Sequence, residues 1–135
     1  MHNKVAGTAL PSPLALAYLG DARHALYIRN MLVRQGIAKP AELNKRALMY
    51  VTAEAQAEAY RRIEAELAED ERDIFRRAAN THHLNKPKHA SVADYRHATG
   101  FEAIIGMLTY LGDEERLGEL FEKIYKENEE NDTEN

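Results

Sequence analysis

The stretch Y-R-H-A-T-G-F-E-A-I-I-G, residues 95–106, reads as part of an apolar helix, yet it contains one acid, Glu102, and two glycines, Gly100 and Gly106. A glycine inside a helix is about 1 kcal/mol less favourable than an alanine. A carboxylate on an apolar face is also unfavourable unless a cation or hydrogen bonds satisfy it. Two unfavourable features so close together indicate a function that needs both.

A second stretch, Y-L-G-D-A at residues 18–22, has the same character. Each stretch places a glycine one or two positions before an acid inside a mostly apolar helix. The helix-face neighbours of Asp21 and Glu102, three and four residues away, are mainly small. Small side chains let two helices approach closely, so the two carboxylates are predicted to converge. Converging carboxylates repel unless a cation lies between them, and oxygen ligands suit a hard ion such as Mg²⁺.

A simpler interpretation is that each acid pairs with a nearby arginine. Arg23, Arg29 and Arg96 are close enough in sequence to be such partners. This interpretation is reasonable for one acid in a helix. The glycine context that Asp21 and Glu102 share favours a common site instead.

Start and stop signals divide the chain into helices, and no alternating pattern predicts a strand. The helix starts are predicted at Ser12-Pro13, Lys39-Pro40, Thr52, Asp70, Ser91 and just after Gly112-Asp113. Residues 80–90 lack periodicity and are predicted to form a loop, and the polar tail 126–135 is predicted to fray. The expected fold class is all-α, with one domain over residues 1–135 and its core at about 12–125.

The composition indicates a soluble, unprocessed protein of the cytoplasm. The 135 residues include no cysteine, which excludes disulfides and thiolate zinc sites and suits a reducing compartment. No run approaches the ~18 apolar residues of a membrane span. The net charge of −4 is unevenly distributed along the chain. Residues 113–135 hold ten acids and three bases, whereas residues 1–112 hold 15 bases and 12 acids.

The segment from Ile74 to His97 is locally basic, with five bases against one acid. Phosphate affinity depends on such a local patch more than on the total charge, so the segment predicts contact with nucleic acid. A solvated charged face without a partner is the alternative. Four histidines in or near the loop are predicted to be solvated or to face RNA rather than to bind zinc, because there is no HExxH spacing. They are His82, His83, His89 and His97.

The two acidic stretches resemble the two halves of the ribonuclease III signature. L-A-Y-L-G-D-A at 16–22 resembles the first half, and A-T-G-F-E-A-I-I-G at 98–106 resembles the second, which carries a metal-binding glutamate. The length, without an appended double-stranded-RNA-binding domain, is similar to that of the Mini-ribonuclease III subfamily. So are L-N-K-R-A, R-R-A-A-N and K-P-K, at 43–47, 76–80 and 86–88. The resemblance covers about residues 12–125.

The resemblance implies a homodimeric, all-α endonuclease that holds double-stranded RNA in a valley across the dimer, each protomer cutting one strand. Asp21 and Glu102 would bind Mg²⁺, or Mn²⁺ in its place, and catalyse phosphodiester hydrolysis that leaves a 5′-phosphate. The implied substrate is the precursor of bacterial large-subunit (23S) ribosomal RNA, with a ribosomal protein or a pre-ribosomal particle as a further partner. The residues expected to contact RNA are Arg76, Arg77, Asn80, Lys86, Lys88 and Arg96.

Two positions depart from ribonuclease III proper, although the Mini-ribonuclease III subfamily is similar in this respect. Ala17 stands where ribonuclease III has a glutamate, and Thr99 stands where it has an aspartate. Fewer carboxylates should leave more of the metal shell to water and to the scissile phosphate. The alternatives are a catalytically inactive RNA-binding protein of the same helical fold and a helical interaction module whose acids are surface residues. The dimer is expected through the first and fifth helices, near Tyr18, Leu19 and Phe101.

Overall fold

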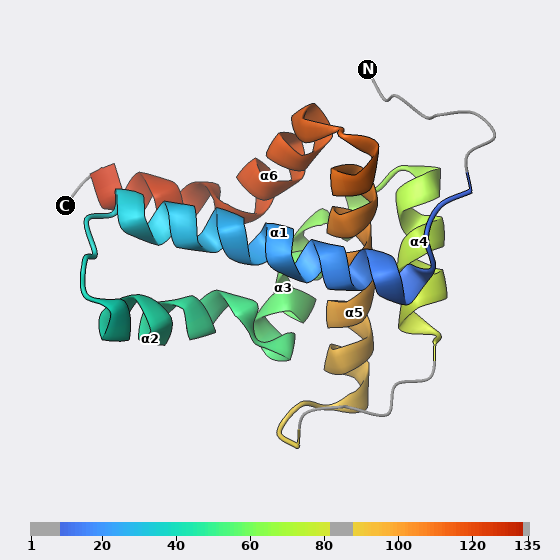
Figure 1. The fold of residues 1–135 in the computed structure, drawn as a ribbon, viewed down its shortest axis with the longest axis horizontal. Coiled ribbons are helices and arrows are strands. Elements are labelled where there is room, and N and C mark those ends of the chain that lie inside the picture. The colour runs from blue at the N-terminus through green and yellow to red at the C-terminus, as the bar shows by residue number, and fades with distance from the viewer. Residues whose placement is uncertain (1–8, 82–87, 134–135) are drawn as a thin grey trace.

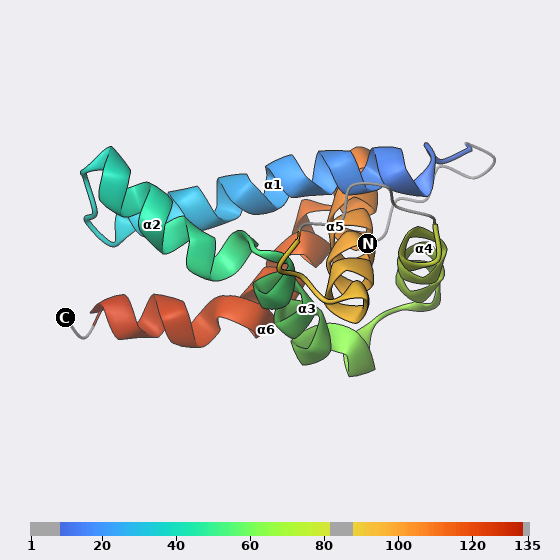
Figure 2. The same cartoon turned by 90° about the horizontal axis from the view of Figure 1, so that it is seen from below.

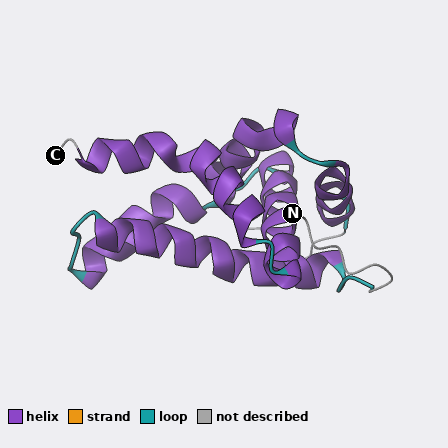
Figure 3. Ribbon diagram, turned by 90° about the horizontal axis from the view of Figure 1, so that it is seen from above, coloured by secondary structure: helices purple, strands orange, loops and turns teal. Residues whose placement is uncertain are grey.

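The described residues of the computed structural model, 9–81 and 88–133, contain helices and connecting segments but no strand (Figures 1 and 3). The all-α prediction is therefore confirmed. Within these residues, no helix combines the length and the apolar character that crossing a membrane requires. The elements are α1 (Pro13–Arg34), α2 (Pro40–Val51), α3 (Ala53–Ile63), the short 3₁₀ helix η1 (Glu64–Glu66), α4 (Glu69–Ala79), α5 (Val92–Leu111) and α6 (Glu114–Thr133).

Helix α5 occupies the centre of the molecule, and α1 crosses it at a steep angle (Figures 1 and 2). Its residues 98–101 and 103–108 are all buried, so the middle of α5 is covered on nearly every side. Helix α4 packs beside α5 and α3 lies against it (Figure 2). The core is continuous from Leu16 and Ile28 of α1 through Ile104 of α5 to Phe121 of α6. Both acidic stretches therefore belong to the two helices that cross at the centre.

Three of the predicted helix starts are confirmed by side-chain caps. The hydroxyl oxygens of Ser12, Thr52 and Ser91 each accept a hydrogen bond from the backbone N–H three residues later, at 3.1, 3.2 and 3.0 Å. Gly112, with φ of 73°, ends α5 in the left-handed conformation that glycine adopts without strain. These local signals fix the ends of the two crossing helices.

The predicted start of α4 is wrong by two residues, because the N-cap is Ala68, held by the Glu71 side chain, and not Asp70. Helix α4 begins at Glu69, and the backbone N–H of Ala68 donates to the Glu71 carboxylate at 2.8 Å. Glu71 is 1% exposed and accepts two further hydrogen bonds of 2.8 Å from Arg116 of α6. This buried ion pair orients Glu71 toward the helix start. The pair is hard to predict from the sequence because Arg116 is 45 residues away from Glu71.

Two further expectations are corrected. Helix α6 continues to Thr133 rather than fraying from residue 126, and the Asn128 amide donates to the Tyr50 hydroxyl at 3.2 Å. Phe101, expected at a dimer seam, is fully buried in the protomer and packs edge-on against the His24 ring with 5.2 Å between the ring centroids. Phe101 is thus a core residue.

Candidate active site

The crossing of α1 and α5 depends on two glycines that face each other. A Cβ atom added to Gly20 would lie 1.7 Å from the carbonyl oxygen of Glu102, and one added to Gly106 would lie 1.7 Å from that of Leu16. Real Cβ atoms do not approach backbone atoms so closely. The expected close approach of the two helices is therefore present, with backbone against backbone. Gly100 serves another contact, since a Cβ there would meet the Phe75 ring of α4 at 2.4 Å.

The close crossing brings the two acids together. Asp21 is exposed and Glu102 is half-buried, and the two carboxyl groups are joined by a side-chain hydrogen bond. Burial first, and then the hydrogen bond and negative charge of Asp21, raise the pKa of Glu102 to about 8 against the opposing effect of Gln56. Glu102 therefore keeps a proton at neutral pH when no cation is near. Such a pair is a site where a cation would take the place of that proton.

Gln56 of α3 is the site residue that sequence reasoning missed. It is 3% exposed, and its amide nitrogen donates to the Glu102 carboxylate at 3.4 Å and to Nδ1 of His24 at 3.2 Å. Both amide hydrogens thus have an acceptor. The only sequence signal was a neutral polar residue among the alanines of the stretch 53–59. Gln56 is placed to hold the Glu102 carboxylate in one orientation.

His24 continues this row of hydrogen bonds into α6. It is fully buried, and its Nε2 lies 2.6 Å from the hydroxyl oxygen of Tyr125. Burial lowers the pKa of His24 to about 4, although the charge of Asp21 acts in the opposite direction. The ring is therefore neutral, and with Nδ1 accepting from Gln56 its proton is on Nε2, facing Tyr125. Four helices thus meet behind the carboxylate pair.

Arginine pairing does not explain the two acids. Arg23 pairs with Glu114 at 3.1 Å and stacks over the Phe121 ring. Neither Arg29 nor Arg96 forms an ion pair with any residue that the structure describes. The simpler interpretation from the sequence is therefore wrong.

The two departures from ribonuclease III add no ligand. Ala17 is buried, and the Thr99 hydroxyl donates to the carbonyl oxygen of Tyr95 at 2.9 Å. Among residues 9–81 and 88–133, no group of three or more histidines, cysteines and acids is placed to hold a metal ion. His89 and His97 are within these ranges, whereas the predictions for His82 and His83 lie outside the described residues. The candidate centre therefore consists of two carboxylates.

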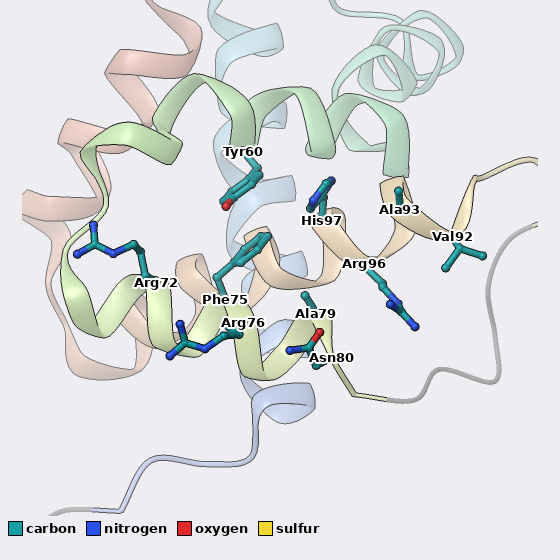
Figure 4. A pocket seen from close by; sticks show the side chains of 10 residues that line it. All are labelled: Tyr60, Arg72, Phe75, Arg76, Ala79, Asn80, Val92, Ala93, Arg96 and His97. Carbon is teal, nitrogen blue, oxygen red and sulfur yellow. The ribbon is translucent and has the colours of Figure 1, made fainter.

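Three of the six residues expected to contact RNA line one pocket, Arg76 and Asn80 from the end of α4 and Arg96 from the start of α5 (Figure 4). Arg77 is exposed outside that lining. Lys88 is exposed, and Lys86 lies outside the described residues.

The segment 74–97 is less basic in space than in sequence. Asp73, one residue before this segment, forms ion pairs with Arg76 at 3.1 Å and with Arg77 at 3.9 Å. Both pairs are solvent-exposed, so they hold the arginines only weakly.

Residues 14–113 match the family described as the Ribonuclease III domain, so this all-α fold is that of an endoribonuclease. The chain therefore belongs to the ribonuclease III family.

Its relatives include proteins named Mini-ribonuclease 3. The one from Brevibacillus brevis is 40% identical over 116 residues, which cover 86% of this chain and 87% of the relative. The one from Thermoanaerobacter sp. is 46% identical over 111 residues, covering 82% and 78%. A crystal structure of a protein from Fusobacterium nucleatum matches with a TM-score of 0.80 and 34% identity, over 89% of this chain and 92% of that one. The likeness thus extends beyond the motifs to most of the chain.

Proposed function

We propose that this endoribonuclease cuts double-stranded RNA in a Mg²⁺-dependent reaction with Asp21 and Glu102 as its metal-binding, catalytic pair. The observation that carries the proposal is the convergence of these two carboxylates at the glycine crossing of α1 and α5. The family membership supports the reaction class, and ribonuclease III enzymes act on double-stranded RNA. Mn²⁺ would be accepted in place of Mg²⁺.

The carboxylate pair fits a divalent cation. Its acids hold a proton that a cation would displace, and the described residues around them supply no arginine in its place. Two carboxylates leave most of an octahedral Mg²⁺ shell to water and to the scissile phosphate. When bound, the ion would lower the pKa of a bound water and neutralise charge on the phosphate.

The surrounding residues would hold and orient the carboxylates. Gln56 fixes Glu102 through one amide hydrogen, and neutral His24 fixes Gln56 through the other. The reaction is a hydrolysis in which water adds to the phosphorus and the 3′ oxygen leaves, so that the product carries a 5′-phosphate. Arg76, Arg77, Asn80, Lys86, Lys88 and Arg96 would position the RNA, since contacts to phosphates fix its register without reading its sequence.

The active form is proposed to be a homodimer that uses the exposed face of α1. Leu14, Tyr18 and Leu26 follow one another along this face at helical spacing, and they are 41, 84 and 60% exposed. An exposed apolar row of this kind is typical of an interaction surface. Two copies related by a twofold axis would place one carboxylate pair on each strand of a duplex.

The proposed substrate is a precursor of bacterial large-subunit (23S) ribosomal RNA in the cytoplasm, free or in a pre-ribosomal particle with its ribosomal proteins. The support is the resemblance of the motifs to the Mini-ribonuclease III subfamily. The lack of cysteine in the sequence suits a reducing compartment.

The test is cleavage of a long duplex RNA with and without Mg²⁺, comparing wild type with Asp21→Asn and Glu102→Gln. Each isosteric variant should lose cleavage while circular dichroism shows an unchanged fold. Near-normal cleavage by either variant would show that the site is assigned wrongly. Duplex binding in EDTA without any Mg²⁺-dependent cleavage would favour the inactive RNA-binding alternative.

A further inference from the structure

A pocket of about 690 Å³ opens between α3, α4 and α5 (Figure 4). This volume falls in the range of about 300–1,000 Å³ that small-molecule sites occupy. One wall consists of the rings of Tyr60, Phe75 and His97. The first two stack face to face with centroids 3.9 Å apart and planes 6° from parallel, and His97 lies 5.4 Å from Tyr60. The pocket therefore offers an apolar, aromatic wall.

The charged side chains of the lining are all cationic. Arg72, Arg76 and Arg96 line the pocket, and no acid among the described residues does. Arg96 has no ion-pair partner in the described part of the chain. Arg76 has only the exposed partner Asp73, which a ligand could replace because such surface pairs are weak. The charge of the lining thus selects an anion.

One polar atom at this site lacks a partner. Nδ1 of His97 is buried and makes no hydrogen bond to the described residues. Buried polar atoms in native proteins nearly always have a partner, and an unpaired one is unfavourable. Asn80, at the end of α4, adds an amide that can both donate and accept. The Asn80 amide is the lining group that a ligand with hydrogen-bonding edges would reach, whereas Nδ1 of His97 has no exposed surface in this conformation.

We propose that this pocket binds one nucleotide, with its base against the aromatic wall and its phosphate on Arg76 and Arg96. A nucleotide joins the three properties that the lining selects: a flat apolar ring, hydrogen-bonding edges and an anionic group. It would be either a free nucleoside monophosphate or an unpaired nucleotide of an RNA strand, because bases within a duplex are stacked and cannot enter a side pocket. The second source rests on the proposed RNA substrate, whereas the first does not.

The free-nucleotide source is tested by isothermal titration calorimetry in EDTA, with the four nucleoside 5′-monophosphates as probes and ribose 5-phosphate and inorganic phosphate as controls. At least one nucleotide should bind about tenfold more tightly than ribose 5-phosphate, since one tenfold step is about the contribution of a well-placed base. Arg96→Ala should weaken that binding about tenfold, as the loss of a charge-assisted hydrogen bond does. The matched control is Arg34→Ala, an exposed arginine at the end of α1 that does not line the pocket.

The RNA source is tested in EDTA with a fully paired duplex and the same duplex carrying one bulged nucleotide. Tighter binding of the bulged duplex, lost in Arg96→Ala but kept in Arg34→Ala, would assign the pocket to RNA. A nucleotide that binds while the bulge brings no advantage would assign it to a free nucleotide.

The proposal is overturned if neither a nucleotide nor the bulge shows this Arg96-dependent binding, or if ribose 5-phosphate or phosphate binds as tightly as the nucleotides. Asp21→Asn should keep nucleotide binding unchanged. Nucleotide binding by the pocket can therefore be judged even if the cleavage assay fails.

Discussion

The glycine crossing of α1 and α5 predicts that Gly20→Ala destabilises the protein, although alanine favours a helix by about 1 kcal/mol over glycine. The new Cβ would lie 1.7 Å from the Glu102 carbonyl oxygen, whereas ordinary contact begins at 3.4 Å, so the helices would have to separate by about 1.7 Å. Overpacking of a core typically costs about 1–3 kcal/mol. Here both contacting groups are helix backbone and cannot rotate away, which places the cost at about 3 kcal/mol or more.

The net loss of at least about 2 kcal/mol corresponds to a fall in Tm of about 4–8 °C for a chain of this size. The assay is thermal unfolding in EDTA at one protein concentration, because association changes the apparent Tm. Gly118→Ala is the matched control, since Gly118 is an exposed position of α6 where a Cβ would meet nothing within 4 Å. Its Tm should hold or rise. A Gly20→Ala protein that is as stable as the wild type would refute the argument.

The other predictions concern the carboxylates, the loop and the dimer. Without metal and above about pH 8, where both acids are ionised, the Tm of Asp21→Asn should hold or rise, because a charge that repels the Glu102 carboxylate is removed. Because the pKa of Glu102 is raised to about 8, the folded protein keeps a proton that the unfolded chain has lost. The free energy of unfolding without metal should therefore fall as the pH rises from about 4.5 to 8. The fall should be smaller in Glu102→Gln. Mg²⁺ affinity, measured by calorimetry, should rise over the same window, since binding displaces that proton. Replacing Lys86 and Lys88 by alanine should weaken duplex binding in EDTA and reduce the salt slope by about one unit per lost contact, and identical salt curves would exclude a role for them. Tyr18→Ala should shift sedimentation toward monomer at micromolar concentration, and an active wild-type monomer would contradict the dimer.

The sequence predicted what local signals determine. Caps such as Ser12 and Ser91 fixed the helix starts, because the capping contact lies within three residues along the chain. The small residues around Asp21 and Glu102 predicted their convergence, since close helix contact needs backbone without side chains between. These features depend on neighbours in the sequence, so they can be inferred before any fold is known.

The sequence did not predict contacts whose partners are far away. Gln56 lies 46 residues from Glu102, and no spacing rule connects them. Glu71, which caps α4, is also held by Arg116 of another helix, 45 residues away. Phe101 was predicted to lie at the dimer interface. The sequence around it is apolar, and such a sequence does not show whether a side chain packs inside the protomer or against a second copy.

The hydrogen bond between His24 and Tyr125 affects where the domain can end. The family match stops at residue 113, one residue before α6 begins. A chain shortened to that match would lose Tyr125 and the Phe121 ring, and it would leave Nε2 of His24 without its partner. Water would then reach His24, whose hydrogen bond holds Gln56, and Gln56 in turn holds Glu102. The minimal nuclease is therefore longer than its recognisable motif, and its last helix serves as the back wall of a site to which it contributes no ligand.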